Sequence, residues 1–173
     1  MIAHICNDLG GWGKGFVVAI SRRWPQPERD YRDWHRHRAG NDFALGATRL
    51  VRVTPDVWVA NMVGQRGIRT GSGGPPIRYD AVERCLTSLA DQAQALGASV
   101  HMPRIGCGLA GGTWNRMEPV IERTLCARHR RDGVRPRVTA PRTGSRSRWD
   151  AAPGGRSRSH PQREASDAQG HRT

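Results

Sequence analysis

Short apolar runs that suit β-strands recur along the first 126 residues of the chain. The run at residues 2–6 predicts a buried strand. Residues 48–54 and 57–63 flank a Pro-Asp turn, and this arrangement predicts a β-hairpin. A fourth strand is expected at residues 99–105.

Between these runs, apolar side chains recur at the three- and four-residue spacing of amphipathic helices. The segments are residues 16–24, 79–96 and 114–126, with a shorter one around Tyr31 and Trp34. Pro25 and Pro27 are expected to end the first helix, because proline lacks the N–H group and clashes with the preceding turn. The alternation of strands and helices predicts an α/β fold, in which ligands bind at the carboxyl ends of the strands.

The charge along the chain divides it into two parts. The 173 residues include 28 basic and 15 acidic side chains, and Lys14 is the only lysine. Residues 1–127 have a net charge of +5, whereas residues 128–173 carry 12 arginines, 4 acidic residues and few large apolar side chains. A segment of that composition cannot bury enough apolar surface to offset its ordering entropy. We therefore expect one domain at residues 1–127 and a disordered C-terminal tail, rich in Arg, Gly, Pro and Ser, at residues 128–173.

The composition also argues against several classes of protein. The sequence has no run of about 18 apolar residues, so no membrane span is expected. Its first residues lack the features of a secretory signal, which makes the cytoplasm the expected compartment. The cysteines form no CxxC pair, and His35 and His37 are not at a zinc-site spacing. We therefore expect neither a metal site nor a cofactor.

Two glycine-rich loops follow two of the expected strands and lead into helices. The first contains Gly10, Gly11, Gly13 and Gly15, and the other spans residues 106–112. Backbone N–H groups in such loops and at helix N-termini favour anions, so the two loops together indicate a phosphate or diphosphate ligand. Each loop taken singly is more typical of a simple turn.

Three stretches of the sequence resemble the ligand-binding segments of macrodomains. The string MPRIGCGL at residues 102–109, followed by Trp114 and a helix, is similar to the second ligand loop of that family. The string AHICNDLGGWGKGF at residues 3–16 is similar to its first ligand loop, and PIRY at residues 76–79 also fits. The resemblance covers residues 2–127. It points to the branch with the terminal ADP-ribose protein glycohydrolases and the ADP-ribose-1''-phosphate phosphatases.

This resemblance implies a three-layer α/β/α domain with a mixed central sheet, and an ADP-ribose site across the ends of its strands. The family's usual first and last strands have no counterpart in the sequence, nor has the aspartate that contacts adenine. Asn7 and Asp8 are expected near the distal ribose, and the two loops around the diphosphate. The matching ligand-binding positions are Asn7, Asp8, Gly11, Trp12, Gly13, Lys14, Gly15, Ile105, Gly106, Cys107, Gly108 and Leu109.

The catalytic residues of the glycohydrolases have no match in the sequence. The resemblance implies a lysine on the strand before the middle loop and an aspartate after the second motif, where this chain has Val-Gly-Gln at residues 63–65 and Ala110. Whether the chain is an enzyme therefore stays open, with His4, Asp8 and Lys14 as candidates for a catalytic role. His4 lies on an expected strand, where histidine is more often a core residue. Lys14 is equally compatible with a solvated loop charge and with a contact to the diphosphate.

The sequence leaves three functions open. The leading one is a macrodomain that binds ADP-ribose or a derivative of it, with hydrolysis of ADP-ribose-1''-phosphate or removal of ADP-ribose from protein as the candidate reactions. The second is a non-catalytic reader of ADP-ribosylated protein, which the missing lysine and aspartate favour. The third is weak, non-specific nucleic-acid binding through the basic tail.

Overall fold

The central element of the fold is a mixed three-stranded sheet. The structure is a computed structural model that describes residues 1–71 and 74–126. Its strands are β1 (Ile2–Asn7), β2 (Thr48–Thr54) and β3 (Val57–Gln65), in the order β1-β3-β2. β1 is parallel to β3, and β2 is antiparallel to it. The hairpin and the first strand expected from the sequence are therefore confirmed.

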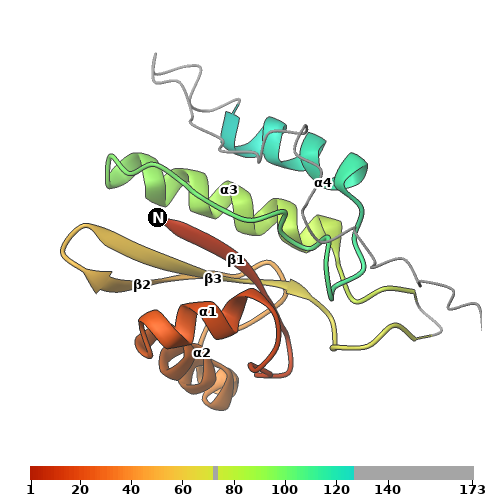
Figure 1. Cartoon of the computed structure of the whole chain (residues 1–173), viewed down its shortest axis with the longest axis horizontal. Coiled ribbons are helices and arrows are strands. Elements are labelled where there is room, and N and C mark those ends of the chain that lie inside the picture. The colour runs from red at the N-terminus through yellow and green to blue at the C-terminus, as the bar shows by residue number, and fades with distance from the viewer. Residues whose placement is uncertain (72–73, 127–173) are drawn as a thin grey trace, which may run out of the picture. The chain divides into compact units, whose positions relative to one another are not determined.

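Helices cover both faces of this sheet, which makes the three layers (Figure 1). One face carries α1 (Phe16–Arg23) and α2 (Gln26–Arg36), and a short 3-10 turn, η1 (Arg38–Gly40), follows them. The other face carries α3 (Tyr79–Ala95), with α4 (Trp114–Ile121) and the π-helical turn η2 (Glu122–Cys126) packed on it. The three-layer α/β/α fold expected from the sequence is confirmed.

Two apolar clusters hold the layers together. The larger lies between the sheet, α3 and α4, and its largest fully buried side chains are those of Met62, Val82, Leu86, Leu89 and Met117. The smaller one joins the sheet to α2 and consists of Cys6, Tyr31, Trp34 and Val63, with Trp12 packed against it. Burying such side chains contributes about 1.5–3 kcal/mol each to folding. Trp12 thus connects the first glycine-rich loop to the core.

The prediction of a strand at residues 99–105 is wrong, because the segment forms one bridge and no continuous strand. The segment pairs with β1 at a single bridge: His101 N–H donates to the Met1 carbonyl, and Ala3 N–H donates to the His101 carbonyl, both at 2.9 Å. Two residues later, Pro103 has no N–H group to extend a ladder. The segment therefore lies beside β1, as a strand would, but forms no continuous strand.

Two further expectations concern the chain as a whole. The tail expected at residues 128–173 lies outside the described residues. Within residues 1–71 and 74–126, none of the helices combines the length and apolarity that crossing a lipid bilayer requires.

Candidate ligand site at the ends of β1 and β3

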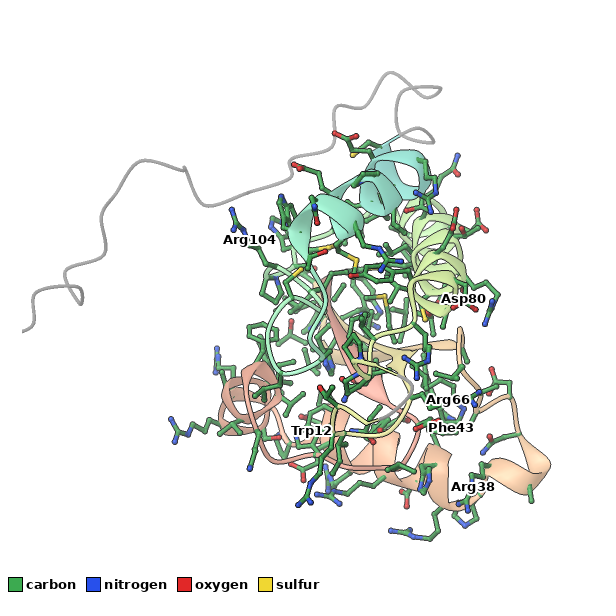
Figure 2. The ribbon with its side chains drawn as sticks, turned by 90° about the vertical axis from the view of Figure 1, so that its right-hand side faces the viewer. Trp12, Arg38, Phe43, Arg66, Asp80 and Arg104 are labelled. Atoms are coloured by element: carbon green, nitrogen blue, oxygen red, sulfur yellow. The ribbon has the colours of Figure 1, made fainter. Side chains whose placement is uncertain are left out.

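Three loops meet at the end of the sheet where β1 and β3 terminate, the side that faces the viewer in Figure 2. We call residues 8–15 the first loop, residues 66–71 and 74–78 the middle loop, and residues 102–113 the last loop. Figure 2 labels Trp12, Arg66 and Arg104, one from each.

Direct contacts join each loop to another. The Asp8 carboxylate of the first loop accepts a hydrogen bond from the N–H of Gly67 in the middle loop, at 2.7 Å. Ile77 N–H of the middle loop donates to the Ala110 carbonyl of the last loop, at 3.1 Å. A Cβ placed on Gly15 would lie 3.3 Å from a methyl group of Leu109. The predicted ligand-binding segments are therefore adjacent in space, although about 90 residues separate them in the sequence.

Asn7 shapes the beginning of the first loop. Its side-chain oxygen accepts hydrogen bonds from Leu9 N–H and Gly11 N–H at 2.9 and 3.0 Å. Its side-chain nitrogen donates to the Gly11 carbonyl at 2.6 Å. Both polar groups of the Gly11 backbone are thus fixed by one side chain, which is itself 8% exposed. In this structure Asn7 organises the loop from its inner side.

The Trp12 side chain is engaged in packing. Its ring lies 5.3 Å from the His4 ring and 5.5 Å from the Tyr31 ring, centroid to centroid. Its indole N–H donates to the Ser21 hydroxyl on α1 at 2.7 Å. The indole is therefore occupied by contacts with neighbouring side chains. Any contact of Trp12 with a ligand would be made by its backbone.

Beyond Trp12, the first loop keeps a run of backbone donors without acceptors. Within residues 1–71 and 74–126, no hydrogen bond from the N–H groups of Gly13, Lys14 or Gly15 is found. Gly15 immediately precedes α1, so these donors lie where the helix dipole adds positive potential. Lys14 is exposed and adds a full positive charge.

The last loop has a compact backbone with donors of its own. Cys107 N–H donates to the Arg104 carbonyl at 3.3 Å, and Gly112 N–H donates to the Gly106 carbonyl at 2.8 Å. Gly106 has φ +69°, and a Cβ there would come within 2.7 Å of an Ile77 methyl group. In the described part of the chain, the N–H groups of Gly106, Gly108 and Leu109 donate no hydrogen bond.

The three loops are basic. They contain five basic side chains, against Asp8 as the single acidic one. The basic residues are Lys14, Arg66, Arg69, Arg78 and Arg104. Partial burial raises the pKa of the Cys107 thiol above its ordinary value, which keeps it neutral. Basic side chains and unbonded N–H groups together make this end of the sheet suited to an anion.

His4 lies beneath the loops and not in them. It is 2% exposed, and its Nε2 lies 2.7 Å from the side-chain oxygen of Asn61 on β3. Burial lowers the pKa of His4 to about 4, so the ring is neutral at physiological pH. This placement is that of a core histidine, and it separates His4 from the loop residues Asp8 and Lys14.

The resemblance matches the glycohydrolase lysine to residues 63–65 and the aspartate to Ala110, and both places are part of the local structure. Gln65 donates from its side chain to the Gly67 carbonyl at 2.8 Å. Ala110 is 6% exposed. Neither side chain can act as a general base or form a covalent adduct.

Three residues on α2 that support the loops were missed by the sequence reasoning: Glu28, Tyr31 and Arg32. A fourth supporting residue, Tyr79 at the start of α3, was identified only as the end of the PIRY string. Tyr79 accepts a hydrogen bond from Thr113 N–H at 3.0 Å, and the Arg116 guanidinium lies 4.0 Å from the centre of its ring. In the sequence these residues look like ordinary polar or apolar positions of amphipathic helices, and only the fold reveals their partners.

Comparisons with known proteins give consistent results. No family model matches the chain. A macrodomain protein from Streptomyces coelicolor is 58% identical, with a TM-score of 0.66, and the match covers 78% of this chain and 83% of that one. A protein of unknown function from Bacteroides thetaiotaomicron is 54% identical, with a TM-score of 0.70 and coverages of 74% and 81%. An ADP-ribose 1''-phosphate phosphatase from Lodderomyces elongisporus is 24% identical over 131 residues, which cover 71% of this chain and 79% of the relative.

Proposed function

Because this chain belongs to the macrodomain family, we propose that it binds ADP-ribose, or a derivative of it, at the ends of β1 and β3. The name of one relative, an ADP-ribose 1''-phosphate phosphatase, supports this ligand class. The predicted ligand residues of the first loop and of the last loop are contiguous across the contact between Gly15 and Leu109, which supports the same place.

The observation that carries the proposal is the presence of unbonded backbone donors on both loops. Three N–H groups at residues 13–15 and three on Gly106, Gly108 and Leu109 lack an acceptor among the described residues. ADP-ribose has two adjacent phosphates, each with a negative charge. Such a group can take up several donors at once and is attracted by the basic side chains around them.

A Gly13→Glu variant tests this assignment. A Cβ on Gly13 would meet no atom within 4 Å, so the new side chain has room, although φ +158° strains any residue with a Cβ, and its charge would repel a diphosphate. Calorimetry with ADP-ribose should show at least tenfold weaker binding, about 1.4 kcal/mol. Gly13→Ala is the matched control, because it has the same backbone strain and free space but adds no charge. Equal affinity in the two variants would contradict the proposal.

Gly106 is a poorer position for the same test. A Cβ there would come within 2.7 Å of Ile77 and 2.8 Å of Met117, both in the core. A Gly106→Glu variant would therefore disturb folding as well as binding. Loss of binding in that variant alone would not identify the ligand loop.

Within this proposed function, a non-catalytic reader of ADP-ribosylated protein is favoured over an enzyme, because the residues matched to the glycohydrolase lysine and aspartate cannot perform their chemistry. Gln65 and Ala110 occupy the places of the glycohydrolase lysine and aspartate. His4 is neutral and buried, which leaves Asp8 and Lys14 as candidate groups. Turnover assays on ADP-ribose-1''-phosphate and on glutamate-linked ADP-ribosyl protein distinguish the two. Binding without turnover supports the reader, and turnover that is lost in Asp8→Asn or Lys14→Gln supports an enzyme.

A further inference from the structure

A closed circuit of hydrogen bonds connects the first loop to α1 and α2. The Trp12 indole N–H donates to Ser21, and the Ser21 hydroxyl donates to Glu28, both at 2.7 Å. The other oxygen of the Glu28 carboxylate accepts from the Arg32 guanidinium, at 2.9 and 3.0 Å. The same guanidinium donates to the Trp12 carbonyl at 3.2 Å, which returns the circuit to its starting residue.

The last bond of this circuit sets the direction of a peptide group. In a trans peptide, the carbonyl of one residue and the N–H of the next point in opposite directions. When Arg32 holds the Trp12 carbonyl, the N–H of Gly13 is turned away from α2. The Gly11 carbonyl is held in a comparable way by Asn7, which fixes the N–H of Trp12. Two consecutive peptide groups of the first loop are therefore oriented by side chains outside it.

The negative charge of Glu28 matters for the circuit, because both oxygens of its carboxylate act as acceptors. Its carboxylate accepts from Ser21 through one oxygen and from Arg32 through the other. The hydrogen bond from Ser21 is the main reason why the pKa of Glu28 lies below its usual value. A glutamine has no charge and offers one acceptor oxygen: if that oxygen faces Arg32, its NH₂ group faces Ser21, whose hydroxyl already accepts from the Trp12 indole and would no longer donate to residue 28.

We propose that Glu28 is a positioning residue that, through Ser21 and Arg32, holds the Gly13 amide in the orientation that binds the diphosphate. This inference rests on the proposed function. Donors that are fixed before binding cost less conformational entropy when the ligand arrives. Release of the Trp12 carbonyl would let the peptide rotate, and the free loop would then lose part of its binding-competent population.

Glu28→Gln in the full chain tests the proposal, with Glu83→Gln as the matched control. Glu83 forms a similar two-oxygen pair with Arg123, at 2.6 and 2.7 Å, and its exposure is comparable, 41% against 29% for Glu28. Glu83 lies on α3, outside the three loops and outside the circuit. Glu28→Gln should bind ADP-ribose about tenfold more weakly than the wild type, about 1.4 kcal/mol. Glu83→Gln should bind as the wild type does.

A spectroscopic measurement separates positioning from a general loss of stability. In ¹⁵N–¹H spectra, the Trp12 indole and Gly13 amide resonances should shift or broaden in Glu28→Gln and stay unchanged in Glu83→Gln. The indole resonance that is absent from the spectrum of a Trp12→Phe variant identifies the Trp12 indole. Unchanged resonances, or an ADP-ribose affinity within about twofold of the control, would overturn the inference. If the wild type binds no ADP-ribose, the proposed function fails, and the resonances alone decide whether Glu28 positions the loop.

Discussion

The Tyr31 hydroxyl donates to the backbone carbonyl of Asn7 at 2.6 Å and lies 3.2 Å from its side-chain oxygen. This pair joins the middle of α2 to the last residue of β1. Because the Asn7 side chain holds both polar groups of the Gly11 backbone, Tyr31 stabilises the base of the first loop from below.

Tyr31→Phe should lower the stability of the domain. Tyr31 is fully buried, so the phenylalanine would leave the Asn7 carbonyl without this donor and with no access to water. The free energy of unfolding should fall by about 1–3 kcal/mol, as for other buried groups that lose a partner. Urea unfolding measures the change. Tyr79→Phe is the control, because its hydroxyl pairs with the exposed Thr113 N–H, and its loss should be smaller. An equal or larger loss in the control would contradict the assignment.

The lowered pKa of His4 predicts how the stability of the domain depends on pH. Burial lowers its pKa in the folded domain to about 4, against 6.5 for a solvent-exposed histidine in the unfolded chain. Between these values the unfolded chain takes up a proton and the folded domain does not. Stability is therefore full above pH 6.5 and falls as the pH drops towards 4, by about 1.4 kcal/mol per pH unit. His35, whose pKa is also lowered, acts in the same direction.

Urea unfolding at pH 7.5 and 5.5 checks this prediction. The wild type should lose about 1.4 kcal/mol between the two values. His4→Gln removes the titrating ring and keeps a donor for Asn61, so the difference should become markedly smaller. A pH dependence that is the same in both proteins would show that His4 is not its source.

Gly64→Ala should destabilise the contact between the sheet and α3. Gly64 lies in β3, and a Cβ there would come within 2.8 Å of a Val82 methyl group and 3.0 Å of an Ile5 methyl group. Both neighbours are packed in the larger cluster, so a shift costs about 1–3 kcal/mol. Thermal unfolding should show a lower midpoint than for Gly40→Ala, whose new methyl group meets no atom within 4 Å. Equal midpoints would mean that the interface accommodates the methyl group.

The sequence was sufficient for the elements whose apolar periodicity is long. The hairpin and α3 follow from alternation and from a 17-residue amphipathic face. Residues 99–105 have the same apolar character as a strand, yet they form a single bridge with β1. Apolar composition reports burial, and it does not report whether successive backbone groups find partners.

The candidate site divides in a similar way. Its glycines were visible in the sequence, because close approach of a backbone to an anion needs residues without a side chain. Its supporting side chains were not. Glu28 and Arg32 are four residues apart on α2, which by itself indicates only a surface ion pair. The bond from Arg32 to the Trp12 carbonyl and the bond from Ser21 to Glu28 depend on how α2 packs beside the first loop and α1, and no local pattern encodes that packing.

Leu109→Ala should weaken ligand binding without a measurable loss of stability. Leu109 is 70% exposed, so its removal uncovers little core, but its methyl group lies 3.3 Å from the place of a Cβ on Gly15, where it would help to keep the last loop beside the first. Without that contact the two sets of N–H donors converge less well on a diphosphate, and we expect about three- to tenfold weaker binding of ADP-ribose. Leu96→Ala is the matched control: Leu96 is also exposed, at 46%, and caps the far end of α3. Calorimetry and thermal unfolding of both variants decide the point. Weaker binding in both, or in neither, would mean that the contact between Leu109 and Gly15 does not hold the loops in register.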